Sequence, residues 1–437
     1  MNPSAQTNHA YPLPEGLPLS SIFQVWLDGQ PAPVAHAGFA DMVIAAGSGP
    51  FHFVIEVPLP VTSASVRPQR WGLKAAIQSN RVAVELPGPA KVMVEISGHK
   101  PILLVAHAPE QNRPDPADPA VRFFAAGQVY EVGRLRLSAG ETLYIEGGAV
   151  VRGALHAVEA NGLRIAGHGI LDGSSFGPEN SQRSIMIEKS QDVVVEGLTM
   201  LRPSTWMIAL GVCDRVVVRD VAQIGEVVCS DGVDVVGSCD VLIEDCLLTN
   251  NDDCVAIKSL GAPGQVPDRV WDWRRDVRGV LVRNCTMLNW GSGNVMEIGF
   301  ELQAESISDI VFQHIDVIGS HVYSAVFSIH NGDRATVRGV RFEDISVEHM
   351  WSKLIDIRIM QSRYTVDKEP GQIRDILFRD IRCISNTFNT PSLIGGFDEH
   401  HTVDNVRFEN FQIGGKPVRN ADDLHAFLRH AHNLTFS

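Results

Sequence analysis

A nine-residue phrase recurs along this chain and constrains its fold more than any other feature. The second, fourth and seventh positions are usually apolar, and the sixth is usually Asp, Asn, Gly or His. Apolar and polar residues that alternate in this way are typical of a half-buried strand, and the sixth-position residues are typical of a turn. The phrase begins at residues 162, 192, 215, 240, 279, 309, 339, 375 and 405.

The intervals between successive phrases run from 23 to 39 residues, which is the spacing of a stacked array of repeats. The units lack long amphipathic patterns with the 3.6-residue period of a helix, so helical repeats are excluded. We therefore predict an all-β chain with a right-handed parallel β-helix, whose coils stack about 4.8 Å apart. Positions one interval apart share a ladder, so Cys246 should stack on Cys285 inside the helix.

The part of the chain before the repeats has a different pattern. Residues 1–110 lack the phrase and hold alternating stretches separated by Pro, Gly and Asn, which predicts an N-terminal antiparallel β-sandwich. The polar, Pro-rich residues 111–120 are the predicted linker, and residues 121–437 the predicted β-helix catalytic domain. A chain of 437 residues with 44% hydrophobic content can bury two such cores. Residues 420–433 are expected to form a short helix or irregular cap over the open end.

Charge and composition limit the partners and the compartment. A formal charge of −14 argues against nucleic acid or an anionic membrane as partner, because both would repel the chain. The chain has no run of 18 uncharged apolar residues, and its first 16 residues lack the pattern of an export signal. We expect a cytoplasmic protein as the chain is written, or a secreted or periplasmic one if a signal has been removed. The sequence predicts no oligomeric state.

Seven cysteines, an odd number without CxxC pairs, indicate buried thiols rather than disulfides or zinc ligands.

Three carboxylates are brought together by the repeat. The stretch "CSDGVDVVGS" (229–238) contains Asp231, and "NNDDCVAIKS" (250–259) contains Asp252 and Asp253, about one coil later. Each ionised carboxylate raises the pKa of its neighbours, so such clusters persist mainly where a proton is held and released or a cation is bound. Both adjacent acids can reach solvent only at a bend, for which Asn250 and Asn251 are suitable. A solvated turn and a bound calcium ion are the alternatives.

These two stretches resemble the paired acidic motifs of the polygalacturonase family, glycoside hydrolase family 28, and of family 49, which contains dextranase and isopullulanase. A β-sandwich before the β-helix also resembles the dextranase arrangement. The resemblance implies that Asp252 is the general acid and that Asp231 and Asp253 activate water, without a metal or other cofactor. Inversion usually requires carboxylates roughly 6.5 to 9.5 Å apart, a spacing we expect adjacent coils to provide.

The motifs that should hold the carboxylate of a pectic sugar are altered. Asn294, in "GSGNVMEIGFE" (291–301), is near the position of the family's histidine, and His330, in "AVFSIHNGD" (325–333), is near that of its lysine. Because Glu297, Glu301 and the net charge repel an acidic polymer, we predict a neutral glycan such as an α-glucan. A pectic-fragment hydrolase is the alternative, with a basic clamp drawn from Arg202, Arg274, Arg275, Arg334 or Arg358.

Further substrate-binding residues are predicted around the acids. Lys258 should pair with Glu297, 39 residues later, as a substrate contact or a structural ion pair. Asn294 and His330 are candidates to bind sugar hydroxyls, and an insertion at 261–279 should overhang the site. Aromatic rings that could stack on pyranose faces, with Trp290 preferred, are Trp206, Trp271, Trp273, Trp290 and Tyr323.

We predict an inverting O-glycosyl hydrolase with a carbohydrate as its partner. A β-helix polysaccharide lyase or epimerase would instead need a base for a C5 proton and usually calcium. A noncatalytic glycan-binding module would bind without forming any product.

Overall fold

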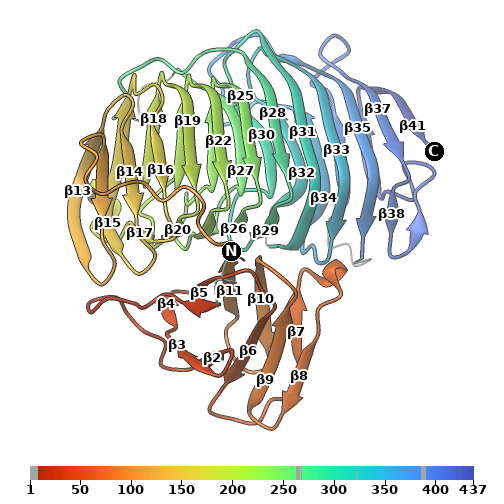
Figure 1. Cartoon of the computed structure of the whole chain (residues 1–437). Coiled ribbons are helices and arrows are strands. Elements are labelled where there is room, and N and C mark those ends of the chain that lie inside the picture. The colour runs from red at the N-terminus through yellow and green to blue at the C-terminus, as the bar shows by residue number, and fades with distance from the viewer. Residues whose placement is uncertain (1–7, 262–265, 267, 322, 385–389) are drawn as a thin grey trace, which may run out of the picture.

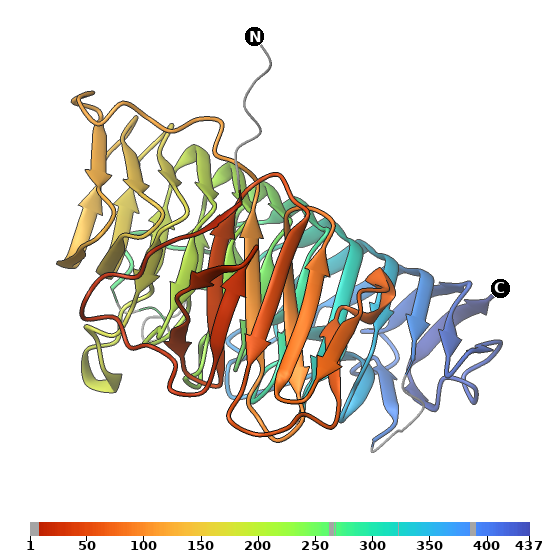
Figure 2. The ribbon, with the colours of Figure 1, turned by 60° about the horizontal axis from the view of Figure 1, so that its bottom comes forward.

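The computed structural model describes residues 8–261, 266, 268–321, 323–384 and 390–437. It contains a small β-sandwich that lies against the side of a long parallel β-helix (Figure 1). Turning the molecule brings the sandwich in front of the middle coils, with the first and last coils projecting beyond it (Figure 2). No described residue belongs to a helix with the length and apolar character needed to cross a bilayer.

The N-terminal domain consists of two sheets packed face to face. The first contains β1 (His9–Ala10), β4 (Ala35–Ala37), β5 (Ala40–Ala46), β7 (Ala64–Arg67), β10 (Ala90–Ile96) and β11 (Ile102–His107). The second contains β2 (Gln24–Leu27), β3 (Gln30–Ala32), β6 (Phe51–Glu56), β8 (Ala75–Gln78) and β9 (Arg81–Leu86). A short 3-10 helix, η1 (Gln69–Trp71), follows β7. The predicted sandwich is confirmed, with one parallel pair, β5 and β11, among antiparallel ones.

The β-helix is a single sheet of 30 strands that winds through three ladders, which confirms the predicted fold. The first ladder carries most copies of the sequence phrase. It contains β12 (Val121–Phe124), β14 (Thr142–Ile145), β16 (Arg164–Ala166), β19 (Gln191–Glu196), β22 (Asp214–Arg219), β25 (Cys239–Glu244), β28 (Val277–Arg283), β31 (Ser306–Ser320), β33 (Thr336–Val347), β35 (Gln372–Cys383), β37 (Val403–Glu409) and β41 (Ala431–Phe436).

The second ladder faces the sandwich, and the third carries the acidic stretches. The second contains β13 (Val129–Leu137), β15 (Val150–Val158), β17 (Ile170–Asp172), β20 (Thr199–Leu201), β23 (Ala222–Ile224), β26 (Leu247–Asn250) and β29 (Thr286–Asn289), and continues into β31. The third contains β18 (Ile185–Glu188), β21 (Ile208–Gly211), β24 (Val233–Val236), β27 (Val255–Ser259), β30 (Met296–Leu302), β32 (Ala325–Asn331), β34 (Lys353–Ile359), β36 (Ser392–Gly395) and β40 (Ala426–Arg429). The second ladder ends in β38 (Gln412–Ile413), which pairs in parallel with the end of β35, while η2 (Pro178–Asn180) and β39 (Lys416–Pro417) lie outside the ladders.

The polar sixth position of the phrase has a conformational cause. Non-glycine residues there, from Asp220 to Asn410, have φ between 50° and 57°, where the chain turns out of the first ladder. This left-handed region is costly for most L-residues but is tolerated by Asp and Asn and is open to Gly. The sequence restriction therefore marks a corner of the coil.

The interior of the β-helix is a continuous apolar column. Cys246 and Cys285 are both buried at equivalent positions, which confirms their predicted stacking. Towards the C-terminus Phe312, Phe342, Phe378, Phe408 and Phe436 form a ladder of parallel rings, with successive centroids 4.8–5.3 Å apart. All seven cysteines are free, and only Cys229 is exposed.

The C-terminal stretch 420–433 corrects one prediction. It contains turns followed by β40 and the start of β41, rather than a helix or irregular cap. Ser392 pairs with Ala426 and Val403 with Ala431, so the last strands continue the third and first ladders. The segment is therefore extended because its backbone forms hydrogen bonds with the open edge of the preceding coil.

The two domains share a buried seam. Apolar residues of β5 and β11, including Met42 and Leu103, pack with outward-facing residues of the second ladder such as Ile224 and Leu247. Ion pairs flank this apolar contact, among them Lys91 with Asp220, Arg67 with Glu348 and Arg70 with Asp316. Both charge and apolar burial therefore hold the sandwich against the β-helix.

Candidate active site

Three successive strands of the third ladder place polar residues at one corner. Asp231, Asp253 and Asn294 each stand two residues before a strand, namely β24, β27 and β30. Gly232 N donates to Asp253 O at 2.8 Å and Cys254 N to Asn294 O at 3.1 Å, so the three positions stack in register. The repeat of the coil thus creates a polar column at the surface.

The structure brings Asp231, Asp252 and Asp253 together, with one carboxylate oxygen from each within 4.8 Å of the others. Asp231 and Asp253 are buried and Asp252 is half-buried. The expected separation of 6.5 to 9.5 Å is wrong for these nearest oxygens, because the stacked coils bring the acid-bearing corners into direct register.

Hydrogen bonds fix the bend that holds the adjacent acids apart. Asp252 accepts from Cys229 N at 3.1 Å and from Ser292 Oγ at 3.3 Å, whereas Asp253 Oδ1 accepts from Asn294 N at 2.6 Å. Asn250 and Asn251 are the bend residues, since their side-chain amides donate to Ser230 O at 3.1 Å and Glu226 O at 2.6 Å. The two acids therefore have different partners.

Lys258 lies among these carboxylates. Its Nζ is 2.9 Å from Asp231 Oδ2, 2.8 Å from Asp234 Oδ1 and 4.0 Å from Asp253 Oδ2. Pairing with Glu297 was predicted and is wrong: β27 aligns Ala256 with Glu297, an offset of 41 residues rather than 39. Counting from coil to coil did not identify Asp234 as a partner of Lys258. Its place three residues after Asp231, in β24, could have indicated that it lies near the acids.

Burial and the charges of neighbouring groups shift the pKa values of the acids and of Lys258. Burial, and then the charge of Asp231, raises the pKa of Asp252 to about 7. Burial raises the pKa of Asp253 well above its usual value, and Asp252 and Asp231 add to this effect. Burial would lower the pKa of Lys258, but the Asp231 and Asp234 carboxylates outweigh it and raise that pKa. The site therefore contains a fixed cation and a carboxyl able to exchange a proton near neutral pH.

Glu297 and His330 form an ion pair below the pocket floor. His330 Nδ1 lies 3.0 Å from Glu297 and its Nε2 lies 3.3 Å from Asp356 Oδ2. Asn294 Nδ2 donates to Glu297 at 2.8 Å, and the ring of Phe300 stacks on His330 at 4.5 Å. Burial would lower the pKa of His330, but Glu297 and Asp356 raise it to about 9. Glu297 is fully buried and His330 nearly so, hence neither faces a substrate directly.

The acids open into a pocket of about 500 Å³, within the range of small-molecule sites. Asn294 and Lys258, which were predicted to bind substrate, line this pocket beside the acids. Its lining residues are Arg183, Thr205, Trp206, Val228, Cys229, Asp231, Asp252, Asp253, Lys258, Ser292, Gly293, Asn294, Gly299, Phe300, Glu301, Arg363 and Tyr364.

Among the predicted aromatic residues, Trp206 lines this pocket. Trp273 is fully buried and donates from Nε1 to Glu188 at 3.0 Å, so its predicted role in stacking on a sugar is wrong. Trp290 packs against Phe39 of the sandwich, with centroids 5.0 Å apart, and Tyr323 is 87% exposed away from the pocket. Trp271 packs with the apolar cluster around Trp273.

The predicted arginine clamp does not assemble at the acids. Each of the five candidates pairs with a carboxylate elsewhere: Arg202 with Asp172, Arg274 with Asp272, Arg275 with Asp214, Arg334 with Glu305 and Arg358 with Asp356. Arg183 and Arg363 line the pocket instead. Arg183 follows η2 and Arg363 lies in a loop after β34. Neither belongs to the repeated phrase, so no sequence pattern predicts their place at the site.

The insertion lies over the third ladder, beside the acids. Val270 N and Trp271 N donate to Glu188 at 2.9 and 3.0 Å, and Arg183 binds Asp268 at 2.7 Å. Residues 262–265 and 267 of the predicted insertion lie outside the described residues.

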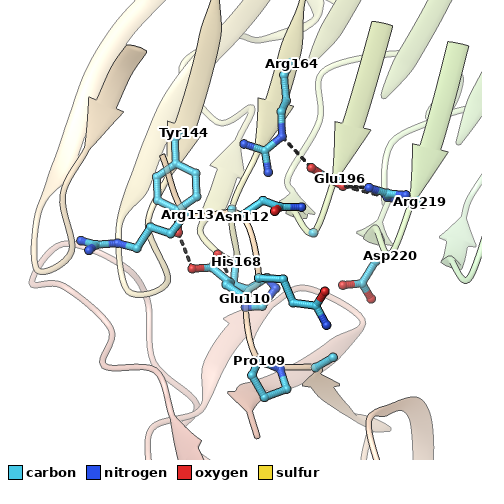
Figure 3. A pocket seen from close by; sticks show the side chains of 14 residues that line it. Pro109, Glu110, Asn112, Arg113, Tyr144, Arg164, His168, Glu196, Arg219 and Asp220 are labelled. Atoms are coloured by element: carbon cyan, nitrogen blue, oxygen red, sulfur yellow. Dashed lines mark hydrogen bonds and ion pairs between the residues drawn. The ribbon is translucent and has the colours of Figure 1, made fainter. Parts of the chain in front are cut away.

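Among the residues that the structure describes, two groups of carboxylate or histidine side chains have the spacing of metal ligands. In the acidic group, the ammonium of Lys258 already supplies a positive charge. The other group, His107, His168 and Asp220, lies at the domain seam beside a pocket of about 330 Å³ (Figure 3). There Lys91 pairs with Asp220, and the two imidazoles stack with an interplanar angle of 13°, so their nitrogen lone pairs do not converge. Neither arrangement favours a bound metal.

Comparisons with known proteins identify the family and the fold. The model of the family "Glycosyl hydrolases family 28" matches residues 149–427. Dex49A from Penicillium minioluteum is similar in structure, with a TM-score of 0.62, 12% identity and coverage of 98% of this chain and 96% of that one. An exopolygalacturonase from Thermotoga maritima gives a TM-score of 0.56 and 16% identity, covering 72% of this chain and 84% of its own.

The polygalacturonase from Erwinia carotovora ssp. carotovora is similar in structure, with a TM-score of 0.51 and 16% identity. The match covers 71% of this chain and 86% of that one. These likenesses show the fold. No curated protein sequence matches the chain.

Proposed function

The chain belongs to glycosyl hydrolases family 28 and is an O-glycosyl hydrolase, and we propose that it cleaves a neutral glycan with Asp252 as the general acid. The observation that carries the assignment of Asp252 is its pKa of about 7, raised by burial and by Asp231. A carboxyl with this pKa holds a proton at neutral pH and can release it to a leaving group.

In the proposed reaction, Asp252 donates its proton to the glycosidic oxygen as the bond from that oxygen to the anomeric carbon breaks. A water molecule attacks the opposite face of the anomeric carbon and gives its proton to the Asp231 and Asp253 pair. Asp231 Oδ1 is buried without a hydrogen-bond partner among the described residues, which supports its role as acceptor for that water. Lys258 Nζ donates to the other oxygen of Asp231 at 2.9 Å.

Inversion is typical of the family, and the product should therefore show the opposite anomeric configuration. The close approach of the carboxylates does not by itself predict this outcome. Proton NMR of the first product formed measures it, and retention would contradict the proposed mechanism.

The charges at the pocket support a neutral substrate. Lys258 is bound to two aspartates and Arg183 to Asp268, so neither is free for a substrate carboxylate. Glu301 adds another acidic group to the lining. Purified protein should release reducing sugar from a panel of dextran, pullulan, arabinan and galactan more readily than from polygalacturonate.

One observation favours a pectic substrate as the second candidate. Arg363 is exposed at the pocket, where its guanidinium donates to the Tyr364 hydroxyl at 2.5 Å, and among the described residues it has no carboxylate partner. A guanidinium in this position suits a uronate. If polygalacturonate or rhamnogalacturonan fragments prove to be better substrates, Arg363→Gln should raise their KM; a preference for neutral glycans would exclude this candidate.

The role of Asp252 is tested by Asp252→Asn. The amide has nearly the same shape but cannot donate a carboxyl proton, so kcat should fall on the order of 10² to 10⁴-fold. Asp240→Asn is the matched control, because Asp240 is exposed near the start of β25 and has φ 56°, which Asn tolerates. Undiminished sugar release by a folded Asp252→Asn enzyme would rule out the proton-donor role.

A further inference from the structure

We propose that this enzyme is exo-acting, taking one end of a glycan chain into the acidic pocket and releasing a short product of constant length. This inference rests on the proposed hydrolase function and extends it. Cleavage inside a polymer requires sugars on both sides of the broken bond, and hence a groove that continues in both directions. The outward face of the third ladder is the surface along which such a groove would run, and it is covered on both sides of the acids.

On the N-terminal side, residues 268–275 form a strap across the third ladder. The outward-facing residues Met186, Ala209 and Val236 of β18, β21 and β24 are buried in one cluster with Trp273. Because Trp273 is fully buried over these strands, no sugar can lie on them.

The strap is anchored at several points. The Glu188 carboxylate accepts from Val270 N, Trp271 N and Trp273 Nε1 at 2.9 to 3.0 Å. Arg275 reaches across to Asp214, with two nitrogen–oxygen distances of 3.0 Å, and donates to Gly237 O at 2.6 Å. These bonds to β18, to β22 and to the turn after β24 hold the strap as a fixed wall rather than a loose cover.

On the C-terminal side, the loop 360–371 closes the same face. The outward-facing His330 and Asp356 of β32 and β34 are buried, and Phe300 stacks on His330. Tyr364 of the loop lies next to Phe300, with ring centroids 5.9 Å apart, and both rings line the pocket. A chain that continued past the acids in this direction would meet the two rings.

This second wall is also fixed from below. Asp333 is fully buried, and its Oδ1 accepts from Val366 N at 2.8 Å and from Asp367 N at 2.9 Å. Its Oδ2 accepts from Leu302 N at 3.0 Å, which ties the loop to the end of β30. Both walls are thus held by buried carboxylates, and the pocket of the acids is lined by Tyr364 of the loop and by Arg183, which is bound to Asp268 of the strap.

The test follows product size during hydrolysis of dextran and of polygalacturonate, together with solution viscosity. An exo-acting enzyme gives one short product from the first time point, and viscosity falls only in step with sugar release. A ladder of long fragments with an early collapse of viscosity would overturn the inference while leaving the hydrolase function intact. No sugar release from these or the other glycans of the panel would overturn both.

A variant of the second wall sharpens the test. Tyr364→Ala removes a half-buried ring from the wall, so products two or three sugars long should appear beside the shortest one. Tyr323→Ala is the matched control, because this tyrosine is 87% exposed and lies outside the pocket lining. If Tyr364→Ala gives the wild-type products, or if Tyr323→Ala changes them equally, the loop does not set the product length and the inference fails.

Discussion

The adjacent residues Asp252 and Asp253 differ because the backbone turns between them. Asp252 receives hydrogen bonds at the pocket mouth, where its proton can reach a substrate, whereas Asp253 is tied to Asn294 N on the next coil. Lys258 is the shared element: it compensates the charge of Asp231 and Asp234 without contacting Asp252. One buried ammonium thereby influences which carboxyl is protonated at neutral pH.

Lys258→Met tests this influence through a pH profile. Activity requires the protonated form of Asp252, so kcat/KM should fall as pH rises through about 7 in the wild type. The ammonium lowers the pKa of Asp252, so its removal should move the alkaline limb to higher pH and also reduce kcat. The matched control is Lys189→Met, at an exposed lysine. An alkaline limb that stays in place or moves to lower pH would contradict the argument.

Cys229 offers a chemical test of the pocket. It is the only exposed cysteine, it lines the pocket, and its backbone N–H holds Asp252. Burial, with Asp252 and Asp231, raises the thiol pKa, so N-ethylmaleimide should inactivate the enzyme slowly at neutral pH and faster at higher pH. Cys229→Ser should keep its activity and resist the reagent. Inactivation of Cys229→Ser at the wild-type rate would show that the reagent acts elsewhere.

The sequence predicted those site residues that the spacing of the coils places together. Asp231 and the Asp252–Asp253 pair follow from counting one coil, whereas Asn294 was predicted from its place near the histidine of the family's motif. Arg183 and Arg363 could not be found in this way, because the segments that carry them vary in length and obey no repeat. Glu297 was wrongly predicted as the partner of Lys258 because β27 and β30 differ by 41 residues where the neighbouring ladders differ by 39.

At the scale of the strand, the third ladder carries buried charges where the second ladder carries apolar contacts with the sandwich. Glu297 on β30, His330 on β32 and Asp356 on β34 form a buried chain of alternating charge beneath the pocket. Alternation along one strand predicts that these residues point outward, but it does not reveal that Phe300 covers them. The sequence pattern therefore predicts which face of its strand each side chain lies on, but not whether that side chain is exposed to solvent.

His330 should make stability depend on pH. Its folded pKa of about 9 lies above the usual value near 6.5, so its contribution is complete below pH 6.5 and is lost as pH rises through 9. His330→Gln should lower the free energy of unfolding by about 3 kcal/mol at pH 6, because Glu297 loses its cation. The difference from wild type should shrink by pH 9.5.

Urea unfolding at both pH values measures the effect of His330→Gln. The matched control is His314→Gln, because His314 pairs with Asp344 at the exposed side of the first ladder. A destabilisation by His330→Gln that is the same at pH 6 and pH 9.5 would refute the role of the imidazolium.

At the scale of the whole molecule, the sandwich reaches the back of the catalytic corner. Phe39 packs on Trp290, and Phe39 N donates to Glu226 at 2.5 Å. Gly38 permits this approach, since a Cβ there would lie 1.8 Å from the Glu226 carboxyl. Glu226 precedes Cys229 in the loop that holds Asp252, so the N-terminal domain contributes to the geometry of the site. Two domains were predicted from the sequence, but not this contact, because no repeat links residue 39 to residue 226.

Phe39→Ala should therefore impair catalysis from outside the pocket. Loss of the ring lets Trp290 and the 225–230 loop shift, and kcat should fall on the order of tenfold with KM little changed. Leu59→Ala is the control, since Leu59 is 66% exposed on the sandwich. An unchanged kcat in a folded Phe39→Ala enzyme would show that the sandwich does not position the catalytic loop.

The sandwich covers only some coils of the β-helix, and this should determine which coils unfold locally first. Its apolar seam involves second-ladder residues from Val150 to Ile318, whereas the coils that end in β40 and β41 project beyond it (Figure 2). Each coil is stabilised mainly by its neighbours, so the last coil, with only one neighbour and an exposed edge, is the least protected. Amide exchange should accordingly run as a gradient, with fast exchange at β41 and slow exchange at β24 and β27. Fraying of the C-terminal end would then leave the catalytic corner intact.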